Sequence, residues 1–351
     1  MTHPTRRKLL AGSATALAAL SAPGLMRHAY AQDVITLRLH QFMAPVATLP
    51  THLLKPWGQE IEAASEGRLV IEHFDAMSLG GRPGDLIDQA RDGVVDITVT
   101  LTGYTPGRFP GSEVFELPFI MTDSVATARA YNKMIEDDFQ ASEFAGIKIL
   151  SGWVHGPGVI HSAEPITKLE DMSGKQMRAP TRVITDLISE LGATAVGMPL
   201  PQIPEALSKG VINGTVIPWE ITPSIKLAEL VHNHTEFKST EALYTATFVM
   251  AMNQPKYDSL PDDLKAIIDA TTGDKMAAAT GKIMADGDAP GRKIAVDAGN
   301  RIIELDQAEV DRWKAASQPV IERWVADAQG KGLDGAALIE KARKLIVEMS
   351  V

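Results

Sequence analysis

Three strand-like stretches decide the fold: VITLRL (Val34–Leu39), LVIEHF (Leu69–Phe74) and VVDITVTL (Val94–Leu101). The first alternates apolar and polar residues, as a half-buried strand does. Two helical patterns lie between them, at Leu53–Ala64, where apolar residues recur three or four apart, and at Leu86–Asp92. This β-α-β-α-β order predicts an α/β fold with a mostly parallel sheet and helices on its faces.

The rest of the chain predicts a second α/β unit and a return to the first. The second unit has strands expected at Ile160–Ser162, Gln176–Arg178, Thr194–Met198 and Val211–Ile217, and helices at Val183–Leu191 and Pro204–Lys209. ALYTATFVMAM (Ala242–Met252) favours a buried strand that returns to the first unit. Helices are expected at Asp262–Thr272, Lys275–Ala285, Glu309–Lys331 and Ala336–Glu348, and one strand within Ile294–Leu305. Two lobes joined in this way leave a cleft, and clefts usually hold ligands.

Composition excludes several classes of protein. The 351 residues are 45% hydrophobic and 22% charged, enough for a large core and two lobes. The absence of cysteine rules out disulfides, thiolate metal sites, iron–sulfur clusters, a cysteine nucleophile and a lipid anchor on cysteine. A net charge of −10 argues against nucleic acid as a partner. Beyond the N-terminal region no apolar run is long enough for stable membrane insertion.

The first thirty-one residues have the pattern of an export signal. Basic residues precede an apolar run at Leu9–Ala22, and Ala29–Ala31 fits a signal peptidase site. TRRKLL (Thr5–Leu10) resembles the twin-arginine motif, although an ordinary secretory signal is an open alternative. An uncleaved anchor is less favoured because the run is short for a span. Cleavage removes four basic residues and no acid, so the net charge goes from −10 to −14, and we expect a periplasmic protein.

Catalytic and metal-binding motifs are absent or weak. The sequence has no G-x-S-x-G, H-E-x-x-H, G-x-G-x-x-G or P-loop signature. His232 and His234 stand two apart, as the start of a zinc site would, but no third ligand is recognisable. We therefore interpret residues 232–234 as exposed polar residues between a helix ending at Val231 and a segment starting at Thr235, and we expect no metal.

Arg178 is the residue that the pattern singles out as a possible ligand contact. Pro180 keeps Ala179 extended, so Arg178 lies at the end of a short strand that can face the cleft. A guanidinium matches a carboxylate with two parallel hydrogen bonds and stays charged at every relevant pH. From the residues alone, a surface salt bridge is the better interpretation.

Other candidate cleft residues lie at strand ends and crossings. LTGYTPGRFP (Leu101–Pro110), which contains Tyr104, is rich in turn formers after an apolar strand and is a candidate pocket wall. Trp153 and His155 lie where the chain enters the second unit, where hinge packing is the alternative to a ligand contact. Trp219, at the end of the strand Val211–Ile217, either closes a pocket or covers the core.

Three longer motifs carry a family resemblance: DMSGKQMRAP (Asp171–Pro180), LGATAVGM (Leu191–Met198) and PEALSKGVING (Pro204–Gly214). Weaker support comes from LGG at 79–81, QARDGVVDI at 89–97, FELPF at 115–119 and MN at 252–253. Together they make nearly the whole mature chain resemble the periplasmic solute-binding subunit of tripartite ATP-independent (TRAP) transporters.

The resemblance implies a two-lobed periplasmic binding protein fold, with hinge strands between the lobes and a long spanning helix. On this fold, residues 32–154 with about 242–285 form the first lobe. Residues 155–241 with about 286–307 form the second lobe, and residues 308–351 form C-terminal helices. It implies a receptor without cofactor or catalysis, which captures an organic acid and delivers it to a small and a large TRAP membrane subunit.

The resemblance also implies roles for individual residues. An arginine at the position of Arg178 holds the ligand carboxylate. The second arginine of many members falls about where Pro157 stands, so a monocarboxylate is more plausible here than a dicarboxylate. Glu220 is the only acid where metal-binding members place their ligands, so no metal is predicted. The other expected contacts are His155 on a neighbouring oxygen, Asn213, and the aromatic residues Phe42, Tyr104, Trp153 and Trp219.

These residues together predict a hydrophobic or aromatic monocarboxylate ligand, such as a 2-oxo or 2-hydroxy acid. Two alternatives stay open. One is a binding protein of an ATP-driven importer or a sensor, which has the same two-lobed shape. The other is an exported hydrolase or lyase that uses Glu220 or His155 as a base.

Overall fold

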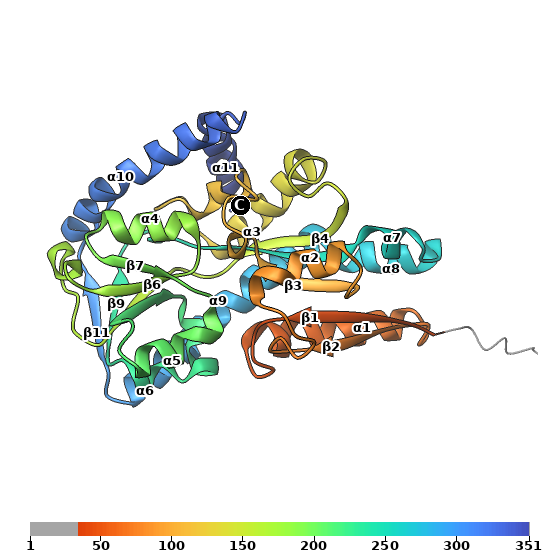
Figure 1. The fold of residues 1–351 in the computed structure, drawn as a ribbon, viewed down its shortest axis with the longest axis horizontal. Coiled ribbons are helices and arrows are strands. Elements are labelled where there is room, and N and C mark those ends of the chain that lie inside the picture. Colours follow the sequence, from red (N-terminus) through yellow and green to blue (C-terminus); the bar gives the residue numbers. More distant parts are fainter. Residues whose placement is uncertain (1–33, 351) are drawn as a thin grey trace, which may run out of the picture. The chain divides into compact units, whose positions relative to one another are not determined.

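The first lobe is built on a five-stranded sheet. The structure is a computed structural model that describes residues 34–350, and the predicted signal peptide, residues 1–31, lies outside the described residues. The sheet has the order β2-β1-β3-β10-β4 (Figure 1). Its strands are β1 (Ile35–Gln41), β2 (Leu69–Phe74), β3 (Ile97–Leu101), β4 (Ile147–Val154) and β10 (Thr247–Asn253). As predicted, β1, β2 and β3 are parallel, whereas β10 runs antiparallel to β3 and β4.

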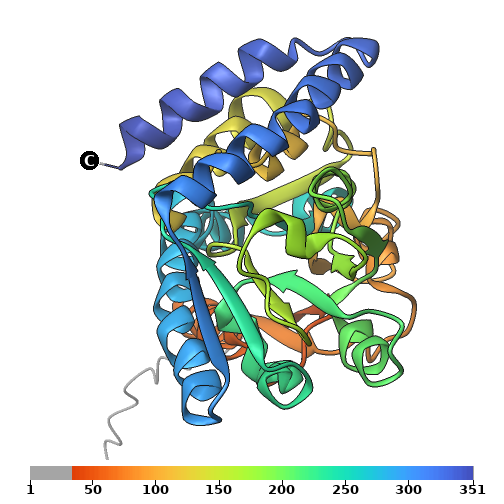
Figure 2. The same ribbon diagram turned by 90° about the vertical axis from the view of Figure 1, so that its left-hand side faces the viewer.

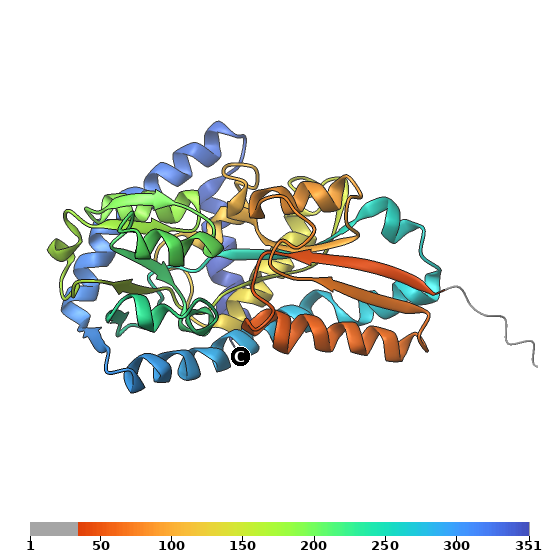
Figure 3. The same cartoon turned by 60° about the horizontal axis from the view of Figure 1, so that its bottom comes forward.

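The second lobe is built on a six-stranded sheet with the order β11-β9-β5-β8-β6-β7. Its strands are β5 (Val159–Ser162), β6 (Gln176–Ala179), β7 (Thr194–Gly197), β8 (Gly214–Ile217), β9 (Asn233–Phe237) and β11 (Arg301–Leu305). Figure 3 shows the two sheets on opposite sides in space, one to the left and one to the right of the view. The two-lobed α/β prediction is confirmed, while the residue boundaries given for the lobes stay a prediction.

Helices cover the faces of both sheets. Those of the first lobe are α1 (Lys55–Ala64), α2 (Leu86–Arg91), α3 (Ser124–Met134), α7 (Gln254–Asp258) and α8 (Asp262–Thr271). Those of the second lobe are α4 (Arg182–Glu190), α5 (Ile203–Ser208) and α6 (Leu227–Leu230). Short 3-10 segments are η2 (Pro83–Asp85), η3 (Thr102–Tyr104), η4 (Ser112–Glu116), η6 (Leu169–Met172), η7 (Leu200–Gln202) and η8 (Trp219–Ile225). Two π-helical turns are η1 (Pro50–Leu54) and η5 (Ile135–Phe139).

The last two helices join the lobes from outside. Helix α10 (Gln307–Gly330) packs against α4 of the second lobe, and α11 (Gly335–Met349) packs against α3 of the first. Figure 2 shows α10 and α11 side by side above the sheets. No helix within residues 34–350 has both the length and the apolar character needed to cross a bilayer.

Three connections cross between the lobes. β4 leads directly into β5, and β9 is followed in the chain by β10. Helix α9 (Gly273–Asp297) packs against α3 and β4 in the first lobe and against η8 and β11 in the second. These connections place the C-terminal ends of β1, β3, β6 and β8 around one interlobe region.

Helix α9 is longer than the sequence pattern predicts. The expected helix ends at Ala285, but α9 continues to Asp297 with Pro290 inside it. The reason is close packing: a Cβ atom on Gly287 would lie 2.8 Å from Cβ of Glu220, and one on Gly291 would lie 2.2 Å from the carbonyl oxygen of Trp219. Because only glycine permits this approach, the contact with η8 stabilises a segment whose local propensity is poor for a helix.

The interpretation of residues 232–234 as exposed is wrong for His234. This residue lies in β9 and is fully buried, whereas His232 is exposed. The pairing of β9 with β5 brings His234 opposite His161. Side chains alternate between the two faces of a strand, so His234 lies on the opposite face of β9 from Asn233 and Thr235, and Thr235 is buried as well.

Candidate functional site

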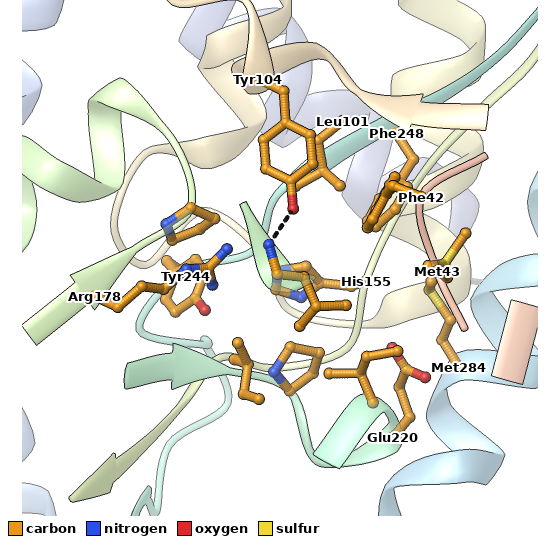
Figure 4. Close-up of a pocket in the computed structure, with 15 residues that line it drawn as sticks. Phe42, Met43, Leu101, Tyr104, His155, Arg178, Glu220, Tyr244, Phe248 and Met284 are labelled. Carbon is orange, nitrogen blue, oxygen red and sulfur yellow. Dashed lines mark hydrogen bonds between the residues drawn. The ribbon is translucent and has the colours of Figure 1, made fainter. Parts of the chain in front are cut away.

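A small cavity lies between the lobes (Figure 4). Most of the lining side chains are apolar or aromatic. The lining residues are Phe42, Met43, Leu101, Tyr104, His155, Arg178, Pro180, Leu200, Ile217, Pro218, Glu220, Ile221, Tyr244, Phe248 and Met284.

Strand ends supply the main contacts. Phe42 follows β1, and Tyr104 ends the short 3-10 helix η3 after β3. Arg178 is the last residue but one of β6, and Glu220 lies shortly after β8. In open α/β sheets the carboxyl ends of parallel strands meet at one edge, which is where ligand loops form. Two such edges face each other here, so residues far apart in the sequence line one space.

Arg178 carries the charge of the cavity. The residue is 2% exposed, Nε donates to the carbonyl oxygen of Met198 at 2.8 Å, and Nη1 donates to that of Val216 at 3.3 Å. No carboxylate within residues 34–350 forms a salt bridge with it. Burial lowers its pKa from the ordinary value, but arginine remains charged at physiological pH. Because buried charges are normally paired, this cation is suited to an anionic ligand.

Two tyrosine hydroxyls accompany the guanidinium. The hydroxyl of Tyr104 accepts a hydrogen bond from the backbone N–H of Leu200 at 3.0 Å, drawn as a dashed line in Figure 4. The hydroxyl of Tyr244 is buried and has no hydrogen-bond partner in the described chain. Burial raises the pKa of both phenols, and the nearby Arg178 charge opposes that shift. Both hydroxyls therefore stay protonated and keep a hydrogen to donate to an anion.

His155 is a neutral group in this site. Its Nδ1 faces the carbonyl oxygen of Gly156, which places the proton on Nδ1 and leaves Nε2 as an acceptor. Burial lowers the pKa of His155 to about 4, and the Arg178 charge lowers it further, while the carbonyl contact opposes the shift. His155 is thus suited to accept a hydrogen bond from a ligand hydroxyl rather than to pair with a carboxylate.

Glu220 is a buried carboxyl in the cavity wall. The residue is 6% exposed, and its Oε2 has no hydrogen-bond partner among residues 34–350. Burial raises the pKa of Glu220 to about 8, the hydroxyl of Thr48 opposes that shift, and the charge of Asp288 adds to it. At neutral pH this side chain is mainly a protonated, uncharged acid.

Aromatic rings form the apolar wall. Phe42 meets Tyr104 edge to face with ring centroids 5.2 Å apart, and it stacks on Phe248 at 6.4 Å. Such pairs hold the rings in fixed orientations. The cavity therefore combines one cation, four neutral polar groups and a rigid aromatic surface.

Five of the residues predicted from the sequence line the cavity: Phe42, Tyr104, His155, Arg178 and Glu220. Three others are placed elsewhere, and they are Trp153, Trp219 and Asn213.

Each of the three has another structural contact. Trp153 is fully buried behind Phe248, with the two rings stacked at 6.1 Å. Trp219 packs edge to face on His161 and donates its indole N–H to Glu236 at 2.7 Å. The side-chain oxygen of Asn213 accepts a hydrogen bond from the backbone N–H of Gln176 at 2.8 Å, and this bond holds the first residue of β6 in place.

Ten of the fifteen lining residues were not predicted as contacts, among them Tyr244, Phe248 and Met284. Tyr244 and Phe248 belong to the apolar run that the sequence identified as a buried strand. The sequence placed both residues where the chain returns from the second lobe to the first, and this position could have identified them as cavity residues. Met284 lies on α9, and no sequence feature distinguishes it from a core residue.

Comparison with known proteins gives one family. Residues 43–327 match DctP, the bacterial extracellular solute-binding proteins of family 7. A TRAP solute-binding protein from Rhodoferax ferrireducens in complex with copurified benzoate is 44% identical, with a TM-score of 0.88, over 90% of this chain and 99% of that one.

Two further structures are similar. A marine metagenome TRAP protein specific for aromatic acid ligands, co-crystallised with 3-hydroxybenzoate, is 43% identical, with a TM-score of 0.89, over 91% of this chain and 100% of that one. A periplasmic TRAP protein from Bordetella bronchiseptica with bound mandelate is 27% identical, with a TM-score of 0.82, over 90% and 99% of the two chains. All three are TRAP solute-binding proteins. The chain belongs to the bacterial extracellular solute-binding proteins of family 7, the solute-binding proteins of TRAP transporters.

Proposed function

We propose that this protein captures an aromatic monocarboxylate in the interlobe cavity and delivers it to a TRAP permease. The observation that carries the proposal is the buried guanidinium of Arg178, which no carboxylate of residues 34–350 neutralises. A ligand carboxylate supplies the missing charge and accepts hydrogen bonds from the guanidinium and from the hydroxyls of Tyr104 and Tyr244. Arg178 is the only arginine or lysine that lines the cavity in the described chain, which favours one carboxylate over two.

The apolar wall supports a ring as the rest of the ligand. Burial of apolar surface contributes about 25 cal/mol per Å², and micromolar capture corresponds to about −8 kcal/mol. One desolvated ion pair and one buried ring are enough to supply that energy. The benzoate, 3-hydroxybenzoate and mandelate bound by the three relatives are ligands of this class.

The proposal includes a periplasmic location and two membrane partners. The predicted export signal and the family both support delivery of ligand to a small and a large TRAP membrane subunit. Genes for those subunits beside this one would favour this assignment over an ATP-driven importer or a sensor. Recovery of the ligand unchanged after long incubation would argue against a hydrolase or lyase.

Isothermal titration calorimetry with benzoate tests the proposal. Arg178→Met is expected to weaken binding at least thirtyfold, since loss of one partner of a buried charge pair typically costs about 2–5 kcal/mol. The ligand-free variant should remain folded with an undiminished Tm, because an apolar side chain replaces an uncompensated charge. Arg323→Met, at a surface pair with Glu190, is the control and should bind as wild type does. Wild-type affinity in Arg178→Met contradicts the proposal.

A further inference from the structure

Glu220 and Arg178 lie on different sides of the cavity. Figure 4 shows the carboxyl group of Glu220 directed inward, away from the position of the guanidinium. The side chain of Glu220 forms no salt bridge in the described chain, and Oε2 has no hydrogen-bond partner there. The carboxyl group of Glu220 is therefore a second polar group of the cavity without a hydrogen-bond partner, and it lies apart from the Arg178 guanidinium.

The surroundings of Glu220 keep it neutral. Its backbone N–H donates to Oδ1 of Asp288 at 2.9 Å, and its carbonyl oxygen accepts from the hydroxyl of Thr48 at 3.1 Å. Burial is the main cause that raises the pKa of Glu220, the charge of Asp288 adds to the shift, and the hydroxyl of Thr48 opposes it. A protonated carboxyl group offers one O–H donor and one acceptor oxygen.

A buried polar atom without a partner is a cost that a suitable ligand removes. Leaving such a group unpaired carries the full desolvation penalty of that group. Sites built to bind a substrate hydroxyl discriminate strongly against analogues that lack it, because the polar groups of the site are then left unpaired. A phenyl ring without a hydroxyl group would leave Oε2 of Glu220 without a hydrogen-bond partner.

We propose that Glu220 is a specificity-determining residue that binds a hydroxyl group on the ring of the ligand, so that the ligand class is a hydroxy-substituted aromatic monocarboxylate. The inference rests on the proposed function, since it takes Arg178 to hold the carboxylate. A hydroxyl fits because it both donates and accepts hydrogen bonds. It can therefore accept from the O–H of the protonated Glu220 or donate to its carbonyl oxygen. A second carboxylate does not fit, because within residues 34–350 no arginine or lysine other than Arg178 lines the cavity.

The test compares benzoate with the three isomers of hydroxybenzoate by calorimetry at pH 7. Wild-type protein should bind at least one isomer ten or more times more tightly than benzoate. Glu220→Leu should reduce that preference to within twofold and leave benzoate affinity equal or higher. Glu220→Gln should keep part of the preference, because an amide also donates and accepts. Glu205→Gln, an exposed glutamate on α5, is the matched control and should keep the full preference.

The outcomes separate this inference from the proposed function. Benzoate binding with no preference for any isomer in wild type overturns the role of Glu220 alone. A preference that persists in Glu220→Leu does the same. If neither benzoate nor any isomer binds, the assignment of the cavity to aromatic carboxylates fails, and the role of Glu220 fails with it.

Discussion

Arg182 and Glu113 form a two-point ion pair between the lobes. Nε of Arg182 donates to Oε1 of Glu113 at 3.1 Å, and Nη2 pairs with Oε2. Arg182 starts α4 of the second lobe, while Glu113 lies in η4 of the first and is 5% exposed. Nη1 of Arg182 also reaches Asp327 at 2.9 Å, and Trp324 donates to Glu113 at 3.3 Å, both from α10. None of these residues lines the cavity, so the cluster acts on lobe position rather than on the ligand.

Arg182→Met should weaken benzoate binding about tenfold, although Arg182 does not line the ligand cavity. The substitution leaves the buried carboxylate of Glu113 without its cation and so destabilises the conformation in which the lobes meet; unpaired buried groups cost about 1–3 kcal/mol. Calorimetry gives the affinity, and small-angle scattering should give a larger radius of gyration for the ligand-free variant.

A matched control exists within the first lobe. Arg129 makes a similar two-point pair with Asp274, with both contacts at 2.9 Å, between α3 and the start of α9. Arg129→Met should leave affinity unchanged. Equal losses in both variants, or no loss in Arg182→Met, would show that the ion pair does not control lobe closure.

A chain of hydrogen bonds connects the surface of the second lobe to the cavity wall. Asn300 donates to Nε2 of His234 at 3.1 Å, and Nδ1 of His234 lies 2.7 Å from Nδ1 of His161. Nε2 of His161 lies 3.2 Å from the carbonyl oxygen of Ile217, a cavity residue. One set of neutral tautomers satisfies every bond, in which His234 donates to His161 and His161 donates to Ile217. Protonation of either ring sets N–H against N–H and breaks the chain.

Stability should therefore fall in acid. Burial lowers the pKa of His234 to about 4 and that of His161 well below its ordinary value, whereas unfolded histidine titrates near 6.5. The unfolded state binds more protons below that pH, so the contribution is full above about pH 6.5 and is lost as the pH falls toward 4. The slope is roughly 1.4 kcal/mol per pH unit for each histidine.

Denaturant unfolding between pH 4 and 7 measures this slope. The double variant His161→Gln/His234→Gln should show a clearly flatter dependence than wild type. His52→Gln, at an exposed histidine, is the control and should keep the wild-type slope. A double variant that loses stability in acid as steeply as wild type would remove the histidine pair as the cause.

The sequence predicts which strand ends meet better than it predicts which side chain faces the cavity. Periodicity locates β1, β3, β6 and β8, and their ends carry Phe42, Tyr104, Arg178 and Glu220 into one space. Trp219 precedes Glu220 by one residue, yet it packs on His161 while Glu220 lines the cavity. Adjacent side chains point in different directions, and the choice between them depends on tertiary packing.

Tyr244 and the part of α9 beyond Ala285 were missed for related reasons. The run Ala242–Met252 is apolar throughout, so it lacks the alternation that assigns residues to one face of a strand. The glycines and the proline late in α9 predict a break on local propensity, whereas close contact with η8 keeps that segment helical. In both cases the deciding interaction is between residues distant in the sequence.

Gly158 controls the position of the Tyr244 ring. A Cβ atom at residue 158 would lie 2.0 Å from Cε1 and 2.3 Å from Cδ1 of Tyr244. The φ angle of Gly158 is not in the left-handed region, so alanine is compatible with the backbone and the ring alone obstructs it. Tyr244 is fully buried, so its ring must move, and the cavity that it lines is the free space beside it.

Gly158→Ala should therefore reduce benzoate affinity at least a hundredfold, with a loss of stability of about 1–3 kcal/mol from overpacking. Calorimetry measures the first effect and denaturant unfolding the second. Gly197→Ala is the control, because its Cβ would meet only Oγ1 of Thr185 at 3.8 Å, an ordinary contact. In the double variant Gly158→Ala/Tyr244→Leu the smaller side chain relieves the clash, so stability should recover and part of the affinity should return. Wild-type affinity in Gly158→Ala would mean that the ring moves elsewhere and that Tyr244 does not border the ligand.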